Sequence, residues 1–289
     1  MTIARLGTLV TTHWLRDQLL ALTAGSKKRP LRVLDASASP DPQVDGYKEF
    51  YMESHIPEAV YFSLHGLCPA SPTSLHKYPI PDSNRFQDYV EGLGICNNTH
   101  VVTYDRSNTA FALKTWWLFR LFGHEKVSVL DGGFRKWLLD GYDVTVEVPK
   151  VERSNFNPSF NAQLVRDFEA MAHNLKAKSW QVADAREPEE FFGTEASGTG
   201  GHIPGACNIP YSTLFEDKGT FKPPQELKKL FDAENIDLGK PLVATCQTAM
   251  TACGIAAAAH LLGKEMVPVY NGAFREWSQR AEPHQIVTD

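Results

Sequence analysis

Cysteine is scarce in this chain, and its pattern excludes two kinds of cysteine-dependent site. The 289 residues contain five cysteines, a small and odd number that does not fit a disulfide framework. The sequence has no CxxC pair and no cysteine and histidine at the spacing of zinc ligands. We therefore expect mostly free thiols in a reducing compartment, and no metal site.

Positive charge is also in short supply. The chain has 29 Lys and Arg against 34 Asp and Glu, a net charge of −5. Nucleic-acid-binding proteins usually carry a basic excess or a basic stripe, so we expect no nucleic-acid partner. The 43% of hydrophobic residues and 22% of charged residues are ordinary for a globular protein. At about 150 residues per domain, the length predicts about two domains.

One segment without charged residues requires a membrane test. No Lys, Arg, Asp or Glu occurs between Lys240 and Lys264, a gap of 23 residues that is long enough to cross a bilayer. The gap opens on a proline and contains several threonines and Gln247, so we interpret it as a buried strand, a polar turn and a buried helix. The N-terminus has no apolar signal-peptide run, and Arg5 and Arg16 make only a weak presequence. We expect no membrane segment and a cytoplasmic location, with the mitochondrion as the alternative.

The same motifs occur twice in the same order, at a spacing of roughly 140 to 150 residues. The matching blocks are 31–37 with 180–186, 54–59 with 201–206, 101–105 with 242–246, and 121–137 with 262–277. This period is too long for a solenoid, so each copy should be a complete domain. We place the domains at residues 1–147 and 163–289, with a proline-containing linker at 148–162.

Within each copy, short apolar runs alternate with a helical stretch. The second apolar run, 101–104 or 242–245, precedes a segment with apolar residues at helical spacing, 111–122 or 252–262. A glycine follows each of these helices, as is typical of a helix end. The alternation predicts an α/β fold in which each domain is a parallel sheet flanked by helices on both faces.

The two copies differ at the residue that follows the second apolar run. The first copy has Asp105 and the second has Cys246. In a parallel sheet, ligands bind in the loops after the carboxyl ends of the strands. Backbone N–H groups and the helix dipole in such a loop favour negative charge, and hence a nucleophilic thiolate. We therefore predict a reactive Cys246. We expect the other four cysteines to be packing residues: Cys68, Cys96, Cys207 and Cys253.

These motifs resemble the tandem-domain rhodanese family, the thiosulfate and 3-mercaptopyruvate sulfurtransferases. The resemblance covers nearly the whole chain, from Leu9 to Trp277. The residues that carry it are Asp184-Ala-Arg186, Gly201-His-Ile-Pro-Gly-Ala206, the Cys246 loop, Trp116-Trp117 and Phe122-Gly-His124. It implies two rhodanese-like domains, with Cys246 catalytic and Asp105 at the equivalent place in a non-catalytic copy.

The resemblance also implies a reaction. Cys246 would take a sulfane sulfur from a small donor, hold it as a persulfide, and pass it to an acceptor. The acceptor would be cyanide or a thiol, such as thioredoxin or a low-molecular-weight thiol. No dissociable cofactor is implied.

The active loop favours a donor of the mercaptopyruvate type. Relatives of the thiosulfate type carry basic residues just after the cysteine, whereas Gln247, Thr248 and Ala249 carry no charge. Met250 and Thr251 complete the implied substrate-binding loop. Ala249 and Met250 stand where relatives commonly have Gly and Val, and alanine resists the positive φ that glycine permits.

A proton relay is implied by the same resemblance. It would run from Thr248 through His55 to Asp45 and protonate the departing enolate of the donor. The residues alone leave alternatives open. His55 also suits a loop-anchoring histidine, and Asp45 also suits a solvated surface residue.

The anion clamp of the family is missing. Relatives hold the carboxylate of the donor with arginines in the segment between the Asp-Ala-Arg motif and the His-Ile-Pro motif. In this chain residues 187–201 contain no basic residue and include Glu190. Arg186 remains, and Lys114 stands where relatives have a basic residue that faces the site. Both are candidates for substrate binding, although Arg186 also suits a structural role and Lys114 a surface position.

Two alternatives to a sulfurtransferase follow from the sequence. A cysteine phosphatase of related fold would need an arginine at the position of Ala252, so it is disfavoured. A non-enzymatic rhodanese-like binding or persulfide-carrier module would fit an impaired donor site. The acidic segment from Glu187 to Glu195 favours that module, whereas the intact Cys246 loop favours the enzyme.

Overall fold

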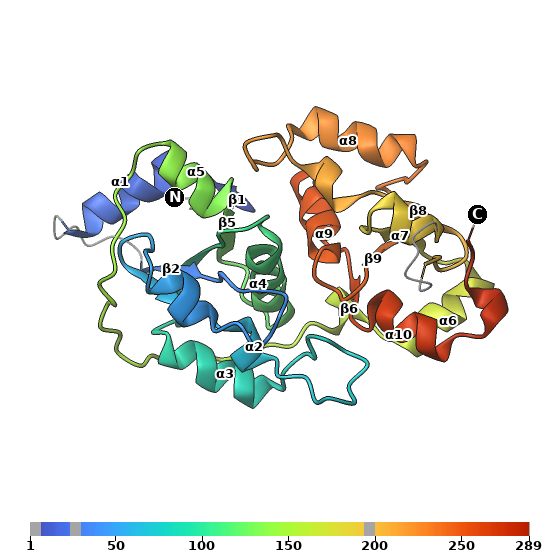
Figure 1. The fold of residues 1–289 in the computed structure, drawn as a ribbon, viewed down its shortest axis with the longest axis horizontal. Helices are drawn as coiled ribbons and strands as arrows, with labels where there is room; N and C mark the ends of the chain where they lie inside the picture. Colours follow the sequence, from blue (N-terminus) through green and yellow to red (C-terminus); the bar gives the residue numbers. More distant parts are fainter. Residues whose placement is uncertain (1–6, 24–29, 194–199, 289) are drawn as a thin grey trace. The chain divides into compact units, whose positions relative to one another are not determined.

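The computed structural model describes residues 7–23, 30–193 and 200–288, which form two compact units (Figure 1). The first unit takes the described residues of Met1–Pro69 and Pro81–Asn161, together with Asp217–Thr220. The second takes Ala70–Ile80, Ala162–Glu216 and the described residues of Phe221–Asp289. Each unit therefore includes a short segment from the other half of the sequence, which the contiguous boundaries expected from the sequence do not contain.

The first unit is built on a five-stranded parallel sheet with the strand order β1-β5-β4-β2-β3. Its strands are β1 (Leu9–Val10), β2 (Leu31–Asp35), β3 (Ala59–Tyr61), β4 (His100–Tyr104) and β5 (Val127–Leu130). Its α-helices are α1 (Thr12–Thr23), α2 (Leu64–Leu67), α3 (Ser83–Gly92), α4 (Ala110–Leu121) and α5 (Gly133–Leu139), and a short π-helix spans Tyr47–Tyr51. Asp35 pairs with Tyr104 at the ends of β2 and β4, so Asp105 lies at the carboxyl edge of the sheet.

The second unit repeats this arrangement with the strand order β6-β10-β9-β7-β8. Its strands are β6 (Val165–Arg166), β7 (Gln181–Asp184), β8 (Ala206–Asn208), β9 (Leu242–Thr245) and β10 (Val269–Tyr270). Its α-helices are α6 (Phe168–Ala177), α7 (Pro188–Phe192), α8 (Pro224–Ala233), α9 (Ala252–Leu261) and α10 (Ala273–Arg280), and 3₁₀ helices span Ala162–Leu164, Tyr211–Leu214 and Pro283–Gln285. Asp184 pairs with Thr245 at the ends of β7 and β9, which puts Cys246 at the carboxyl edge.

Each sheet is buried because helices cover it. In the first unit, Val102 and Tyr104 of β4 pack in one core with residues of α1 and α5, including Phe134. Side chains alternate between the faces of a strand, so the neighbouring residues of β4 face the side of α4, a helix whose twelve residues are all buried. In the second unit, Val243 of β9 packs with residues of α6 and α10, while α9 lies along β9. This confirms the predicted α/β fold.

The helices that follow the two equivalent central strands end in the same way, as the sequence predicts. Gly123 after α4 has φ of 80° and Gly263 after α9 has φ of 89°. The N–H of each glycine bonds to a carbonyl three residues back, and the next N–H bonds to a carbonyl five residues back. This is the Schellman pattern, which satisfies the last carbonyls of a helix and requires a left-handed residue.

The uncharged gap between Lys240 and Lys264 forms strand β9, a turn and helix α9, as interpreted from its polar residues. Among the helices in the described part of the chain, none is long and apolar enough to cross a membrane.

Candidate active site

Cys246 lies directly after β9 and is 1% exposed. Its carbonyl accepts a hydrogen bond from the N–H of Phe274 at 2.8 Å, and the carbonyl of Gln247 accepts one from the N–H of Arg275 at 3.1 Å. Phe274 and Arg275 belong to the first turn of α10. The cysteine and the residue that follows it are therefore held between the central strand of the sheet and the start of a helix.

The loop from Cys246 to α9 turns back through a left-handed residue. Ala249 has φ of 58°, a left-handed conformation that glycine adopts more readily than alanine. A non-glycine residue there is strained by about 1–2 kcal/mol. Ala249 and Met250 are buried, while Gln247, Thr248 and Thr251 are half-buried. These residues form the turn that connects the cysteine to α9.

In the equivalent loop of the first unit, the backbone N–H groups bind the side-chain carboxylate of Asp105. Asp105 Oδ1 accepts hydrogen bonds from the N–H groups of Ser107 at 2.9 Å and Thr109 at 3.0 Å. Asp105 Oδ2 accepts one from the N–H of Ala112 at 2.9 Å. Burial raises the pKa of Asp105, while these three N–H donors act in the opposite direction. Backbone groups of this loop therefore converge on one negative charge.

The loop of the second unit has Cys246 in place of the carboxylate. No backbone N–H of residues 247–252 has an acceptor among the described residues. The two loops differ in length by one residue, because α4 begins five residues after Asp105 and α9 six residues after Cys246. The left-handed residue is Thr109 in the first and Ala249 in the second. Such clustered N–H groups at the start of a helix bind anions.

His55 is committed to the fold of the first unit. Its ring is buried and stacks on Tyr51 with centroids 3.8 Å apart. Its nitrogens Nδ1 and Nε2 lie 2.8 Å and 3.0 Å from the carbonyl oxygens of Tyr51 and Glu147. Both ring nitrogens already have partners, so this geometry favours the loop-anchoring role.

The second unit contains the same histidine arrangement. The ring of His202 stacks on Phe191 at 3.9 Å, and its Nδ1 lies 3.0 Å from the Phe191 carbonyl oxygen. His55 bridges to Thr145 and His202 to Val287, both in antiparallel fashion. Because His55 and His202 have the same geometry and only one of the two units contains Cys246, the fold accounts for this histidine position.

Asp45 does not approach His55 through any hydrogen bond among the described residues. Its carboxylate accepts from the backbone N–H of Tyr47 at 3.1 Å and pairs with Lys48 at 3.6 Å, with the side chain about half exposed. This is the solvated surface position that the sequence left open. The first unit therefore does not assemble the His55–Asp45 part of the implied relay.

Arg186 is the buried partner of Asp184. Its Nε lies 3.0 Å and its Nη2 2.7 Å from Asp184 Oδ2, and Nη2 also donates to the Gly201 carbonyl at 2.8 Å. The guanidinium lies over the ring of Phe274, 3.9 Å from its centroid. These contacts occupy the group and leave it little freedom to clamp a donor.

Lys114 is not a surface residue. It lies on α4 with a fully buried side chain, and its Nζ is 4.2 Å from the ring centroid of Trp117. This cation–π contact lies within the first unit. The alternative of a surface lysine was therefore wrong, while its role in donor binding stays a prediction.

The other four cysteines are free and differ in environment. Burial raises the pKa of Cys68 to about 11, and burial also raises the pKa of Cys207. Cys253 donates to the carbonyl of Ala249 at 3.6 Å. Cys96 is half-buried, and the Thr99 hydroxyl lowers its pKa, a contact that the sequence alone does not reveal.

The acidic segment retains no clamp in its described part. Glu187 bonds to Ser212, with 3.0 Å between Oε2 and Oγ, and Glu190 is half-buried on α7. Glu195 lies outside the described residues. Among the described residues, no group of three or more His, Cys, Asp and Glu side chains could hold a metal ion.

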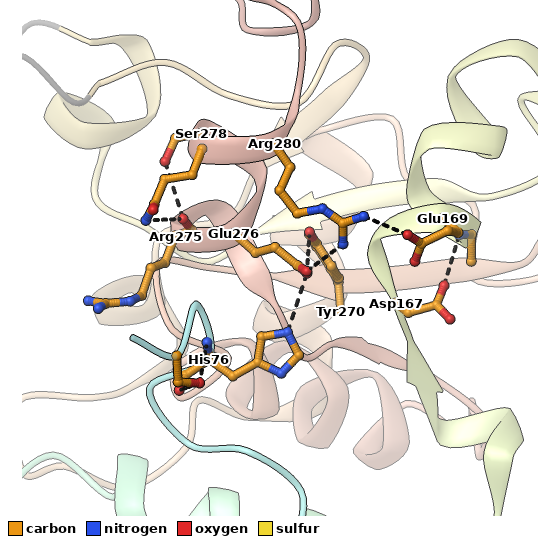
Figure 2. A network of polar contacts seen from close by, with 11 residues as sticks. His76, Asp167, Glu169, Tyr270, Arg275, Glu276, Ser278 and Arg280 are labelled. Atoms are coloured by element: carbon orange, nitrogen blue, oxygen red, sulfur yellow. Dashed lines mark hydrogen bonds and ion pairs between the residues drawn. The ribbon is translucent and has the colours of Figure 1, made fainter. Parts of the chain in front are cut away.

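The start of α10 is fixed by a polar network in the second unit (Figure 2). Glu276 accepts from the Tyr270 hydroxyl at 2.9 Å and pairs with Arg280 at 2.8 Å. Arg280 also pairs with Glu169 at 2.6 Å, and His76 lies 3.5 Å from Glu276. This network positions the helix whose first turn holds the Cys246 loop.

Known proteins match this chain over nearly its whole length. The rhodanese-like domain model matches residues 16–140 and 167–280. Thiosulfate sulfurtransferase of Gallus gallus is 41% identical over 285 residues, which cover 97% of this chain and 96% of that protein. The 3-mercaptopyruvate sulfurtransferase of Mus musculus is 39% identical over 288 residues, which cover 97% and 95%.

A solved structure agrees with these relatives. The crystal structure of SseA from Escherichia coli, described as a 3-mercaptopyruvate sulfotransferase, superimposes with a TM-score of 0.80 at 28% identity. It covers 93% of this chain and 99% of that one. Relatives of both donor types match at nearly equal identity, so they do not separate the donors. The chain belongs to the rhodanese family, as a sulfurtransferase with two rhodanese-like domains.

Proposed function

We propose that Cys246 carries sulfur as a persulfide, taken from a small anionic donor among which 3-mercaptopyruvate is favoured over thiosulfate. The observation that carries this proposal is the contrast between the two equivalent loops. In the first unit, three N–H groups surround the carboxylate of Asp105. In the second, the equivalent residue is Cys246, which has a shorter side chain, and the N–H groups of residues 247–252 have no acceptor among the described residues. A persulfide would extend this side chain by one negatively charged sulfur atom.

The proposed reaction has two steps. The Cys246 thiolate attacks the sulfur of 3-mercaptopyruvate, a sulfur–sulfur bond forms, and the carbon–sulfur bond breaks. The electron pair goes to the carbon, and the resulting enolate takes the proton of the donor thiol to become pyruvate. An acceptor thiolate, or cyanide, then attacks the outer sulfur and releases the Cys246 thiolate. No external oxidant or reductant is consumed.

The composition of the loop supports the choice of donor. Gln247, Thr248 and Ala249 add no positive charge next to Cys246, which suits a singly charged carboxylate better than dianionic thiosulfate. Thr248 is half-buried in the loop, and its hydroxyl can carry the proton between the donor thiol and the enolate. We leave His55 and Asp45 out of this step because their side chains are engaged elsewhere in the first unit.

The acceptor is proposed on chemical grounds alone. A persulfide transfers its outer sulfur to a soft nucleophile, so a low-molecular-weight thiol or a reduced protein thiol such as thioredoxin is suitable. A cytoplasmic location would supply such thiols. Release of pyruvate with each of these acceptors, measured side by side, ranks them.

Intact mass after incubation with each donor tests the proposal. Addition of one sulfur, about 32 Da, is expected with 3-mercaptopyruvate, because persulfidation is a reversible modification of a thiol. The added mass should disappear in Cys246→Ser and persist in Cys96→Ser, which removes the thiol whose pKa the Thr99 hydroxyl lowers. Absence of added mass with both 3-mercaptopyruvate and thiosulfate would contradict the proposal.

A further inference from the structure

An anionic donor needs a positive partner near Cys246, and most cations of the second unit are engaged. Arg186 pairs with Asp184 inside the fold. Arg280 pairs with Glu276 and Glu169. The loop itself contributes no basic residue, and the described part of the segment before Gly201 contributes none either.

Arg275 is joined directly to the catalytic loop. Its backbone N–H donates to the carbonyl of Gln247 at 3.1 Å, next to the Phe274–Cys246 hydrogen bond. The Arg275 residue is exposed. Its backbone carbonyl accepts bonds from Ser278 and Gln279, whereas its guanidinium has no hydrogen bond or ion pair among the described residues.

The side chain of Arg275 takes no part in the polar network of Glu276 and Arg280. In Figure 2, the guanidinium of Arg275 points away from Glu276 and Arg280, which pair with each other on the same helix. A free guanidinium with five donors is suited to bidentate recognition of a carboxylate. The backbone N–H of the same residue is hydrogen-bonded to Gln247, the residue that follows the proposed nucleophile Cys246.

We infer that Arg275 is the donor-binding cation of this chain, replacing the arginine clamp that its acidic segment lacks. This inference rests on the proposed function, since it assigns the group that holds the carboxylate while Cys246 attacks the sulfur. The first unit supplies a matched control. Arg135 has the equivalent place on α5, and its Nη1 donates to the carbonyl of Asp217 at 3.3 Å, in a unit with Asp105 in place of the cysteine.

Steady-state kinetics with 3-mercaptopyruvate provide the first arm of the test. Arg275→Gln should raise KM about tenfold, the factor for one charge-assisted hydrogen bond, with little change in kcat. Arg275→Lys should recover part of the loss, and Arg135→Gln should match wild type. An unchanged KM in Arg275→Gln would overturn the inference.

Alkylation provides a second arm that does not depend on sulfur transfer. Iodoacetate is an anion and iodoacetamide is neutral, so their rate constants at Cys246, followed by peptide mass, report the local charge. Arg275→Gln should slow iodoacetate several-fold and leave iodoacetamide unchanged. Equal effects on both reagents, or none, would overturn the inference. If wild type forms no persulfide but this charge selectivity holds, the proposed function fails while the anion site stands.

Discussion

The guanidinium of Arg186 lies 3.9 Å from the ring centroid of Phe274, and in the first unit an arginine from a different loop takes the equivalent place. There Arg106 lies 4.2 Å from the ring centroid of Phe134 and donates to the carbonyl of Ser54, the counterpart of Gly201. Arg186 follows β7, whereas Arg106 follows β4. Two loops that supply the same cation over the same phenylalanine indicate a requirement of the fold.

Arg186→Ala should therefore weaken the fold more than it weakens donor binding. Asp184 would remain as a buried charge without its partner, which lowers the free energy of unfolding by about 3–5 kcal/mol. Urea denaturation followed by circular dichroism measures the loss. Arg106→Ala is the matched control, with a smaller loss of about 1–2 kcal/mol, because its ion-pair partner Glu53 is exposed. A raised KM with an unchanged unfolding midpoint would instead make Arg186 a substrate residue.

His55→Asn and His202→Asn should behave alike. Each removes a ring that stacks on an aromatic neighbour and bonds to its carbonyl oxygen, so each should lower the free energy of unfolding by about 2–4 kcal/mol. The kcat of folded His55→Asn should stay near that of wild type. A large fall of kcat in His55→Asn alone, accompanied by a changed pH profile, would restore the proton relay.

Asp105→Asn should leave turnover nearly intact, since the unit that contains it has no nucleophile at this place. The folded chain should still be less stable by about 1–3 kcal/mol. The NH₂ group of the asparagine would replace the carboxylate oxygen that accepts from the N–H of Ala112, and that N–H would lose its acceptor. Pyruvate release and urea denaturation measure the two effects. Complete loss of turnover would mean that the first unit takes part in the chemistry.

The same variant gives a pH dependence with a definite sign. Burial raises the pKa of Asp105, so the folded chain keeps this proton to a higher pH than the unfolded chain. Its stabilising contribution is complete below the ordinary pKa of about 3.9 and is lost as the pH rises through the raised value. The free energy of unfolding of wild type minus that of Asp105→Asn should therefore fall from about pH 4 upward. A difference that grows with pH would mean that the fold lowers the pKa of Asp105.

Ala249→Gly should stabilise the chain, although glycine usually destabilises. The positive φ of Ala249 costs more than the extra entropy of an unfolded glycine, which leaves a net gain of about 0.5–1 kcal/mol. Ala256→Gly in the interior of α9 is the control and should lose about 1 kcal/mol. Thermal and urea midpoints compare the two, and destabilisation by Ala249→Gly would show that the loop is not strained.

The fold could be predicted because both copies contain the same local sequence patterns. Helical spacing marked α4 and α9, glycine marked their ends, and the differing residue marked the carboxyl edge where Asp105 and Cys246 lie. The reciprocal segments Ala70–Ile80 and Asp217–Thr220 could not be assigned, because neither contains a periodic apolar pattern that indicates the unit against which it packs.

The sequence singles out Cys246 as the candidate nucleophile but does not predict the contacts around it. Cys246 follows from a comparison of the two copies, but the partners of Arg186 and His55 are set by contacts between residues far apart in sequence. Arg275 was present in a matching block, beside Phe274, yet sequence alone does not reveal the backbone bond that places it against Gln247. Hydrogen bonds of this kind leave no signature in residue type.

The carboxylate of Asp105 has a consequence for the stability of the first unit. A loop whose amides all point inward is unfavourable when empty, and a domain that relied on a transient ligand would be stable only part of the time. A side chain that carries its own negative charge satisfies the same amides permanently. The loop of the first unit therefore needs no bound ligand to satisfy its amides, whereas the loop of the second unit has no carboxylate at the equivalent place.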